Sequence, residues 1–85
     1  MDIITAKEAG QLSLRKYYKD HKKVIDNCMA AIQEAVSEGK RYLYYEAREK
    51  DVSDILIIFL DALGYTVTVV NYFDTSINIR WKYTV

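Results

Sequence analysis

An amphipathic segment from Leu14 to Glu38 constrains the fold of this chain more than any other feature. At about 100° per residue, its apolar side chains gather on one face of a helix and its charged side chains on the other. The apolar face carries Leu14, Tyr18, His21, Ile25, Cys28, Met29, Ile32 and Val36. The polar face carries Arg15, Lys16, Lys19, Lys22, Lys23, Asp26, Gln33 and Glu34. Gly39 follows, and glycine commonly ends helices. We therefore predict a long helix that needs an apolar surface to cover.

A second helix start lies upstream of this segment. Thr5 and Glu8 have the spacing of a capping box, in which each side chain bonds the backbone N–H of the other residue. Gly10 weakens the helix that begins there, and Ser13 offers another cap. We predict a short first helix that ends in this region, before the long helix begins.

The middle of the chain predicts one strand and a third helix. Residues 41–46 are rich in tyrosine and favour a strand. After a charged loop, Asp51 or Ser53 can cap a helix from Asp54 to Leu63, and Gly64 would end it. This helix is apolar over most of its circumference, so it is either deeply buried or packed on a partner chain.

Two further strands are predicted over Tyr65–Val70 and Ser76–Thr84. In the last strand, alternate side chains face opposite sides. One side carries Ile77, Ile79, Trp81 and Tyr83, and the other carries Asn78, Arg80, Lys82 and Thr84.

The predicted fold is therefore a single α+β domain over residues 1–85, in the order α-α-β-α-β-β. The long helix and the third helix would pack on one face of a three-stranded, mostly antiparallel sheet.

Composition excludes several classes of protein. Twelve basic and twelve acidic residues give zero net charge, which argues against a histone-like coat or an acidic nucleic-acid mimic. The single cysteine, Cys28, permits no intrachain disulfide and suits a reducing compartment.

The first residues lack the pattern of a signal peptide. The longest apolar run, Ile55–Leu60, is far short of the ~20 residues that span a bilayer. We expect an intracellular protein without a membrane segment.

The sequence offers no catalytic constellation. His21 and Cys28 share a helix face, but seven residues at 1.5 Å per residue place them about 10 Å apart along the axis. His21 is best explained as a histidine at the core edge and Cys28 as a small buried hydrophobe. One histidine and one cysteine are too few for a typical zinc site. The three glycines are scattered rather than joined in a phosphate loop. We expect no enzyme activity and no cofactor.

Two basic surfaces are candidates for binding an anionic ligand. Residues 15–23 hold five positive charges, one negative charge and two tyrosines, which could bind phosphate and stack on a base. The alternative is an ordinary solvated helix face. Arg80 and Lys82 mark the open sheet face, where cations also protect a sheet from aggregation. The candidate ligand-binding residues are Arg15, Lys16, Tyr17, Lys19, Lys23, Arg80 and Lys82.

Apolar and aromatic residues predict self-association. Asp54 and Asp61 mark the only polar strip on the surface of the third helix, and Ile57 lies between them. Eight tyrosines are many for 85 residues, and tyrosine is enriched at protein interfaces. We expect a homo-oligomer. Its candidate interface residues are Ile57, Tyr44, Tyr72 and Phe73.

Several short motifs carry a resemblance to known sequences. The chain opens with Ile4-Thr5-Ala6-Lys7-Glu8-Ala9 before a long amphipathic helix and a tyrosine-rich strand. It continues with Leu63-Gly64-Tyr65-Thr66-Val67 and closes with Ile79-Arg80-Trp81. This order resembles small accessory proteins and modules of tailed bacteriophages. The resemblance implies expression in the cytoplasm of a bacterial host and a role as a virion component or an inhibitor of host defence. It implies no catalytic residues.

Three hypotheses about function follow. The first is a non-enzymatic phage accessory protein, most concretely a counter-defence protein that sequesters an anionic nucleotide signal of host immunity. The second is a virion-associated module whose aromatic surface contacts another protein. The third is weak nucleic-acid binding through residues 15–23. Zero net charge provides no long-range attraction to a polyanion, so we expect no strong binding to duplex DNA or RNA.

Overall fold

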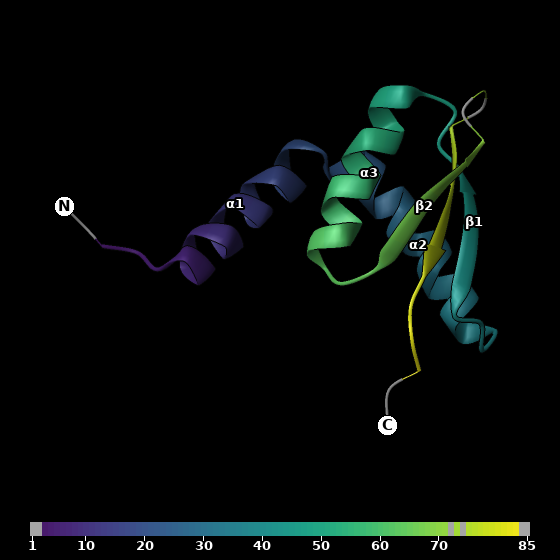
Figure 1. Cartoon of the computed structure of the whole chain (residues 1–85), viewed down its shortest axis with the longest axis horizontal. Helices are drawn as coiled ribbons and strands as arrows, with labels where there is room; N and C mark the ends of the chain where they lie inside the picture. The colour runs from purple at the N-terminus through teal and green to yellow at the C-terminus, as the bar shows by residue number, and fades with distance from the viewer. Residues whose placement is uncertain (1–2, 72, 74, 84–85) are drawn as a thin grey trace.

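The computed structural model describes residues 3–71, 73 and 75–83 (Figure 1). Within them the order α-α-β-α-β-β is confirmed, and the chain has an α+β fold. The elements are α1 (Ala6–Asp20), α2 (Lys22–Ser37), β1 (Tyr42–Glu46), α3 (Lys50–Ala62), β2 (Thr66–Asn71) and β3 (Ser76–Arg80). None of the described helices is both long and apolar enough to cross a membrane.

The N-terminal helical segment, residues 6–37, is interrupted at His21 between α1 and α2. The prediction of a break between Gly10 and Ser13 is therefore wrong. Thr5 does cap α1, because its hydroxyl accepts a hydrogen bond from the Glu8 N–H at 3.2 Å. The helix then continues through Gly10, since one glycine costs only about 1 kcal/mol in a helix interior. It ends where the His21 N–H is shared between the carbonyls of Tyr17 and Tyr18, at 3.2 and 3.1 Å.

A side-chain bond spans this break. The Tyr18 hydroxyl donates to Asp26 Oδ1 at 2.6 Å and so links α1 to the second turn of α2. Because the two helices are not continuous, the predicted single apolar face is wrong in part. Val36 is exposed, and Ala35 is the residue buried near the end of α2.

The third helix begins earlier than predicted. It starts at Lys50 after Glu49, so Asp51 and Ser53 lie inside the helix and neither is its N-cap. Ser53 is buried. The predicted end is nearly right, because α3 stops at Ala62 and Gly64 follows with φ +98°, which favours glycine.

The three strands form one antiparallel sheet in the order β1-β3-β2. Because β1 and β2 both run antiparallel to β3, they are parallel to each other, and α3 connects them across one face. The predicted alternation of the last strand does not extend to Tyr83. Since β3 ends at Arg80, Tyr83 lies beyond the ladder and is exposed. The predicted strand end, Thr84, lies outside the described residues.

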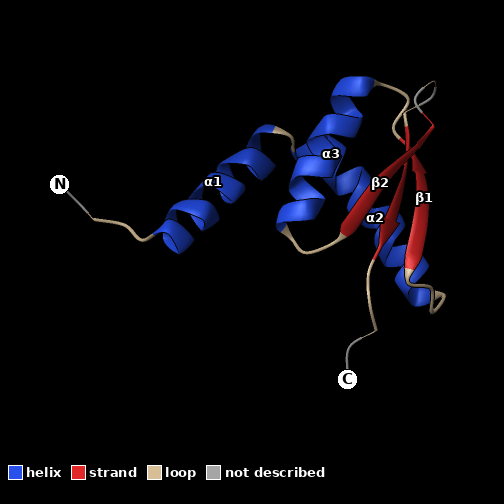
Figure 2. Ribbon diagram, viewed as in Figure 1, coloured by secondary structure: helices blue, strands red, loops and turns tan. Residues whose placement is uncertain are grey.

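The core lies between the sheet and the pair α2 and α3 (Figure 2). Its fully buried members are Cys28, Ile32, Leu56, Leu60, Ile77 and Ile79. None of the described helices covers the other face of the sheet (Figure 2). Helix α1 extends away from this body and contains no buried residue. The fold thus leaves two open features, which are the outer sheet face and the N-terminal helix.

Candidate anion-binding site

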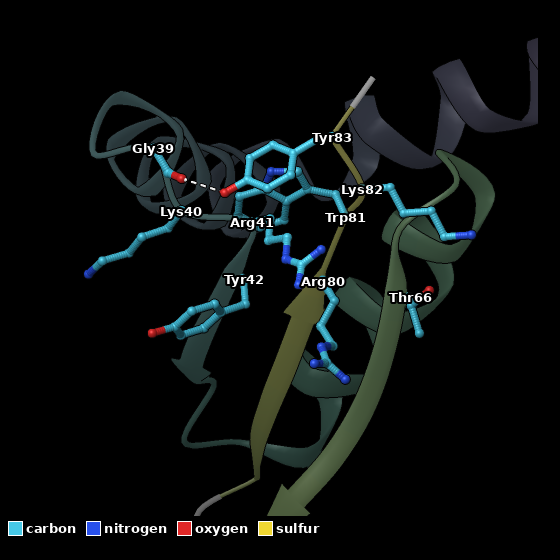
Figure 3. A pocket seen from close by; sticks show the side chains of 9 residues that line it. All are labelled: Gly39, Lys40, Arg41, Tyr42, Thr66, Arg80, Trp81, Lys82 and Tyr83. Carbon is cyan, nitrogen blue, oxygen red and sulfur yellow. Dashed lines mark hydrogen bonds between the residues drawn. The ribbon is translucent and has the colours of Figure 1, made fainter. Parts of the chain in front are cut away.

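The strand register brings one residue from each strand into a row on the outer face. Tyr42 of β1 and Thr66 of β2 both pair with Arg80 of β3. Figure 3 shows the Arg80 side chain between these two neighbours. Side chains alternate along a strand, so Ile79 points into the core while Arg80 points outward. The row therefore places an arginine beside an exposed tyrosine.

The turn between α2 and β1 supplies the rim of the site. Gly39 has φ +78°, a conformation that glycine adopts without strain, and it turns the chain out of the helix. Lys40 and Arg41 follow at once. The Trp81 N–H donates to the Arg41 carbonyl at 3.0 Å, which extends the pairing of the chain segments past the end of β3.

These segments enclose a pocket of about 630 Å³ at the end of the sheet (Figure 3). Its lining residues are Gly39, Lys40, Arg41, Tyr42, Thr66, Arg80, Trp81, Lys82 and Tyr83. Among the described residues that line it, four are cations and none is acidic. The cations come from two stretches that are far apart in sequence, residues 40–41 and 80–82, so the positive charge is assembled only by folding.

The four cations differ in whether they already have an ion-pair or cation–π partner within the fold. Lys40 Nζ lies 2.9 Å from a carboxylate oxygen of Glu38, and this hydrogen bond raises the pKa of Lys40. The Arg41 guanidinium lies over the Tyr83 ring, 5.4 Å from its centre, in a cation–π contact. Among the described residues, Arg80 and Lys82 have no ion-pair partner. They are the cations most available to a bound anion.

The aromatic residues of the pocket also differ in accessibility. Trp81 is half-buried and meets Tyr65 edge-to-face at 5.9 Å, so its ring belongs to the packing of the core. Tyr83 is covered by Arg41 on one side, and its hydroxyl donates to the Gly39 carbonyl. Both rings are exposed, Tyr83 at 69% and Tyr42 at 54%. Among the described residues no ring or cation–π contact involves Tyr42, so both faces of its ring are open to a flat ligand, whereas one face of Tyr83 is taken by Arg41.

The sequence-predicted ligand residues separate into two groups. Arg80 and Lys82 lie in this pocket. Arg15, Lys16, Tyr17, Lys19 and Lys23 lie on α1 and the first turn of α2, and none of them lines it. Lys16 is paired with Asp20 at 2.8 Å, and the Tyr17 ring contacts the ring of His21 at 4.7 Å. The structure does not bring the two basic surfaces together in one pocket.

The candidate interface residues lie in different places. Ile57 is half-buried against the core cluster, and its neighbour Ile58 is the exposed large apolar side chain of α3, at 57%. Tyr44 is half-exposed on the outer face of the sheet, one row from Tyr42. Phe73 is fully exposed after β2, and Tyr72 lies outside the described residues.

Lys40 and Arg41 were missed by the sequence analysis. The sequence did contain a pattern that could have indicated them, because these two cations directly follow the glycine that ends α2 and precede a strand. Their importance depends on the pairing of the start of β1 with the end of β3, which adds Arg80 and Lys82 to them. That register could not be read without knowing which strands are neighbours.

Cys28 and His21 are the two side chains considered above for nucleophilic catalysis. Cys28 is completely buried, and burial raises the pKa of its thiol to about 12, so it is not a nucleophile near neutral pH. His21 lies between α1 and α2 with its ring against Tyr17. No group of three potential metal ligands occurs in the described part of the chain.

Comparison with known proteins provides no relative from which to transfer a function. No protein-family model matches the chain, and neither a curated protein nor a solved structure matches it. The geometry and charge of the pocket are therefore the features from which a function can be proposed.

Proposed function

We propose that this chain is a non-enzymatic binding protein that takes an anionic nucleotide into the pocket at the end of the sheet. The observation that carries the proposal is the pairing of exposed Tyr42 with Arg80 on the open face. A base needs a flat partner and a phosphate needs charge-assisted donors. This pair supplies both on adjacent strands.

The charge of the pocket supports a phosphorylated ligand over a neutral one. Arg80 and Lys82 are free of carboxylate partners among the described residues, and an arginine can bind two phosphate oxygens at once. Thr66 adds a hydroxyl on the other side of Arg80. The volume of about 630 Å³ is within the range of about 300–1,000 Å³ typical of small-molecule sites.

The resemblance to tailed-bacteriophage accessory proteins suggests a setting for this activity. In that setting the protein would act in the host cytoplasm and sequester a nucleotide signal of bacterial immunity, as a counter-defence protein. Binding without turnover suffices for this role.

Isothermal titration calorimetry with ADP, a cyclic dinucleotide, inorganic phosphate and adenosine tests the proposal. We expect binding of the two nucleotides and no heat with adenosine. Arg80→Ala should weaken nucleotide binding at least tenfold. Arg15→Ala is the matched control, because Arg15 is an exposed arginine outside the pocket. If Arg15→Ala weakens binding instead, the basic face of α1 holds the ligand and the proposed site is wrong.

The stacking step has its own matched pair of variants. Tyr42 and Tyr44 are both about half exposed on the same face, but only Tyr42 lines the pocket. We expect Tyr42→Ala to weaken nucleotide binding, with a smaller effect on inorganic phosphate, and Tyr44→Ala to leave both unchanged. Equal effects of the two variants would contradict a stacked base.

A protein-interaction module, for example one associated with the virion, is the second candidate. The exposed side chains of Tyr44, Val70 and Phe73 favour it, since aromatic and apolar residues on a surface often mark protein contacts. No heat with any nucleotide would favour this reading. Tight, salt-resistant binding to duplex DNA would contradict both candidates, because few phosphate contacts are possible at one small pocket.

A further inference from the structure

Helix α1 packs on the body of its own chain mainly through Tyr18, whose ring stacks on that of Phe59 of α3 with 5.9 Å between ring centres and whose hydroxyl bonds Asp26 of α2. It has 15 residues, and none of them is buried. Figure 1 shows it extending away from α3 and the sheet. The radius of gyration is 14.2 Å, against about 12 Å for a compact chain of this length. Isolated helices of about 15 residues are only marginally stable in water, so burial of more of its exposed side chains would stabilise α1.

A groove runs between α1 and α3 with a volume of about 450 Å³. It is lined by Lys7, Gly10, Gln11, Ser13, Leu14, Tyr17, Ile58 and Ala62. Ile58 is 57% exposed at this groove, and Leu12 on the same helix as Leu14 is 54% exposed. A Cβ on Gly10 would meet no atom within 4 Å. The chain therefore gives no internal packing reason for a glycine here, whereas a second helix crossing closely at this point would.

The two helices that form the groove carry opposite charge. Helix α1 has four basic and two acidic side chains, and α3 has one basic and three acidic side chains. Their net charges are therefore +2 and −2. An α1 helix from another molecule would meet attraction from α3, and the reciprocal contact would be the same. This self-complementarity is what a two-fold symmetric interface requires.

We propose that the groove is occupied by α1 of a second copy of this chain, so that α1 and α3 of both copies form an intermolecular four-helix bundle. The two α1 helices cross near Gly10, where the absent side chain lets the backbones approach. Ile58 of each copy then becomes covered. This inference is independent of the nucleotide pocket, because α1 contributes none of that pocket's lining residues.

Sedimentation equilibrium over a range of protein concentrations tests the proposal. We expect a dimer, and Ile58→Lys should raise its dissociation constant at least tenfold. The new lysine lies four residues after Asp54 and three before Asp61, so it suits the isolated helix while placing a charge in the interface. Val36→Lys is the control, since Val36 is similarly exposed on α2 and does not line the groove. Equal dissociation constants for the two variants would overturn the proposed interface.

Gly10→Gln separates the dimer from a structural role of α1. Glutamine is a good helix former, so the substitution should preserve or strengthen α1 in a monomer. At a helix crossing its side chain blocks close approach, and the dissociation constant should rise by tenfold or more. Nucleotide binding measured on the same variant should stay unchanged. A chain that remains a 9.9 kDa monomer at all concentrations would refute the proposal.

Cross-linking locates the contact directly. Gln11→Cys places a thiol at the proposed crossing, and Gln33→Cys places one on the exposed face of α2. Native Cys28 is buried and does not compete. Under mild oxidation we expect a disulfide-linked dimer from Gln11→Cys and much less from Gln33→Cys. Equal amounts from both variants would show random collision and would contradict the proposed arrangement.

Discussion

The hydroxyl of Tyr83 donates a hydrogen bond to the carbonyl oxygen of Gly39 at 3.1 Å, across 44 positions of sequence. Arg41 lies over the same tyrosine ring. These two contacts tie the segment after β3 to the turn after α2, and together they form one rim of the candidate anion site. Tyr83 therefore closes the edge of the pocket together with the backbone bond between Trp81 and Arg41.

Substitution of Tyr83 tests this closure. Tyr83→Phe removes the hydrogen bond and keeps the ring beneath Arg41. We expect the free energy of unfolding to fall by no more than about 1 kcal/mol, because the bond is exposed to water. Tyr83→Ala also removes the ring and should weaken nucleotide binding more than Tyr83→Phe does. Urea unfolding and calorimetry on the same samples provide both measurements. Equal affinities for the two variants would argue against a contribution from the ring.

The core can be tested with two residues of α3 that lie two positions apart. Leu56 is fully buried, and Ile58 is more than half exposed. Leu56→Ala should lower the free energy of unfolding by about 2–5 kcal/mol, through lost burial and the cavity left behind. Ile58→Ala, measured in urea at low protein concentration, should cost less than about 1 kcal/mol, since exposed sites respond weakly. Similar losses of unfolding free energy in the two variants would indicate that α3 turns a different face towards the core.

Alanine should act with opposite sign at two glycines. Gly39 has φ +78°, and a left-handed conformation costs an L-residue roughly 1–2 kcal/mol. Gly39→Ala should therefore lower the midpoint of thermal unfolding. Gly10 lies inside α1 with no atom near its Cβ position, so Gly10→Ala should stabilise the monomer by up to about 1 kcal/mol. Thermal melts followed by circular dichroism will show whether the signs differ.

The sequence was sufficient for the element order because most of its signals are local. Thr5 caps α1, Gly39 and Gly64 follow the ends of α2 and α3, and alternation identifies β3. The break at His21 was not visible, since the amphipathic pattern continues across it. A hydrogen bond between Tyr18 and Asp26 joins the two helices across this break.

The candidate site was only half predictable for the same reason. Arg80 and Lys82 were found from the alternation of one strand. Lys40 and Arg41 join them through strand pairing, which one strand cannot reveal. The charge run at residues 15–23 was the stronger signal in the sequence. In the folded chain, two of its five cations, Lys16 and Lys22, are paired with aspartates on the next helical turn.

The link between α1 and α2 should depend on pH at its acidic end. Hydrogen bonds from Lys22 and then Tyr18 hold the pKa of Asp26 below its ordinary value of 3.8. Because the folded chain lowers this pKa, the stabilisation is fully present above pH 3.8 and is lost as the pH falls through the lowered value. Acid titration of Asp26→Asn, followed by circular dichroism, should show a shallower loss of stability than the parent chain. Parallel curves would contradict the contribution of this carboxylate.

At alkaline pH the group whose titration should affect the stability of the fold is Cys28. Burial raises the pKa of its thiol from 9.0 to about 12, so the folded chain keeps the proton that the unfolded chain releases. The stabilisation from this group is therefore present below pH 9 and is lost as the pH rises from 9 towards 12. Cys28→Ala should lose less stability across this window, measured by urea unfolding at each pH. A thiol reagent at pH 8 should label the parent chain in urea and leave the native chain unmodified. Rapid labelling of the native chain would show that Cys28 is accessible and that the packing of α2 on the sheet is wrong.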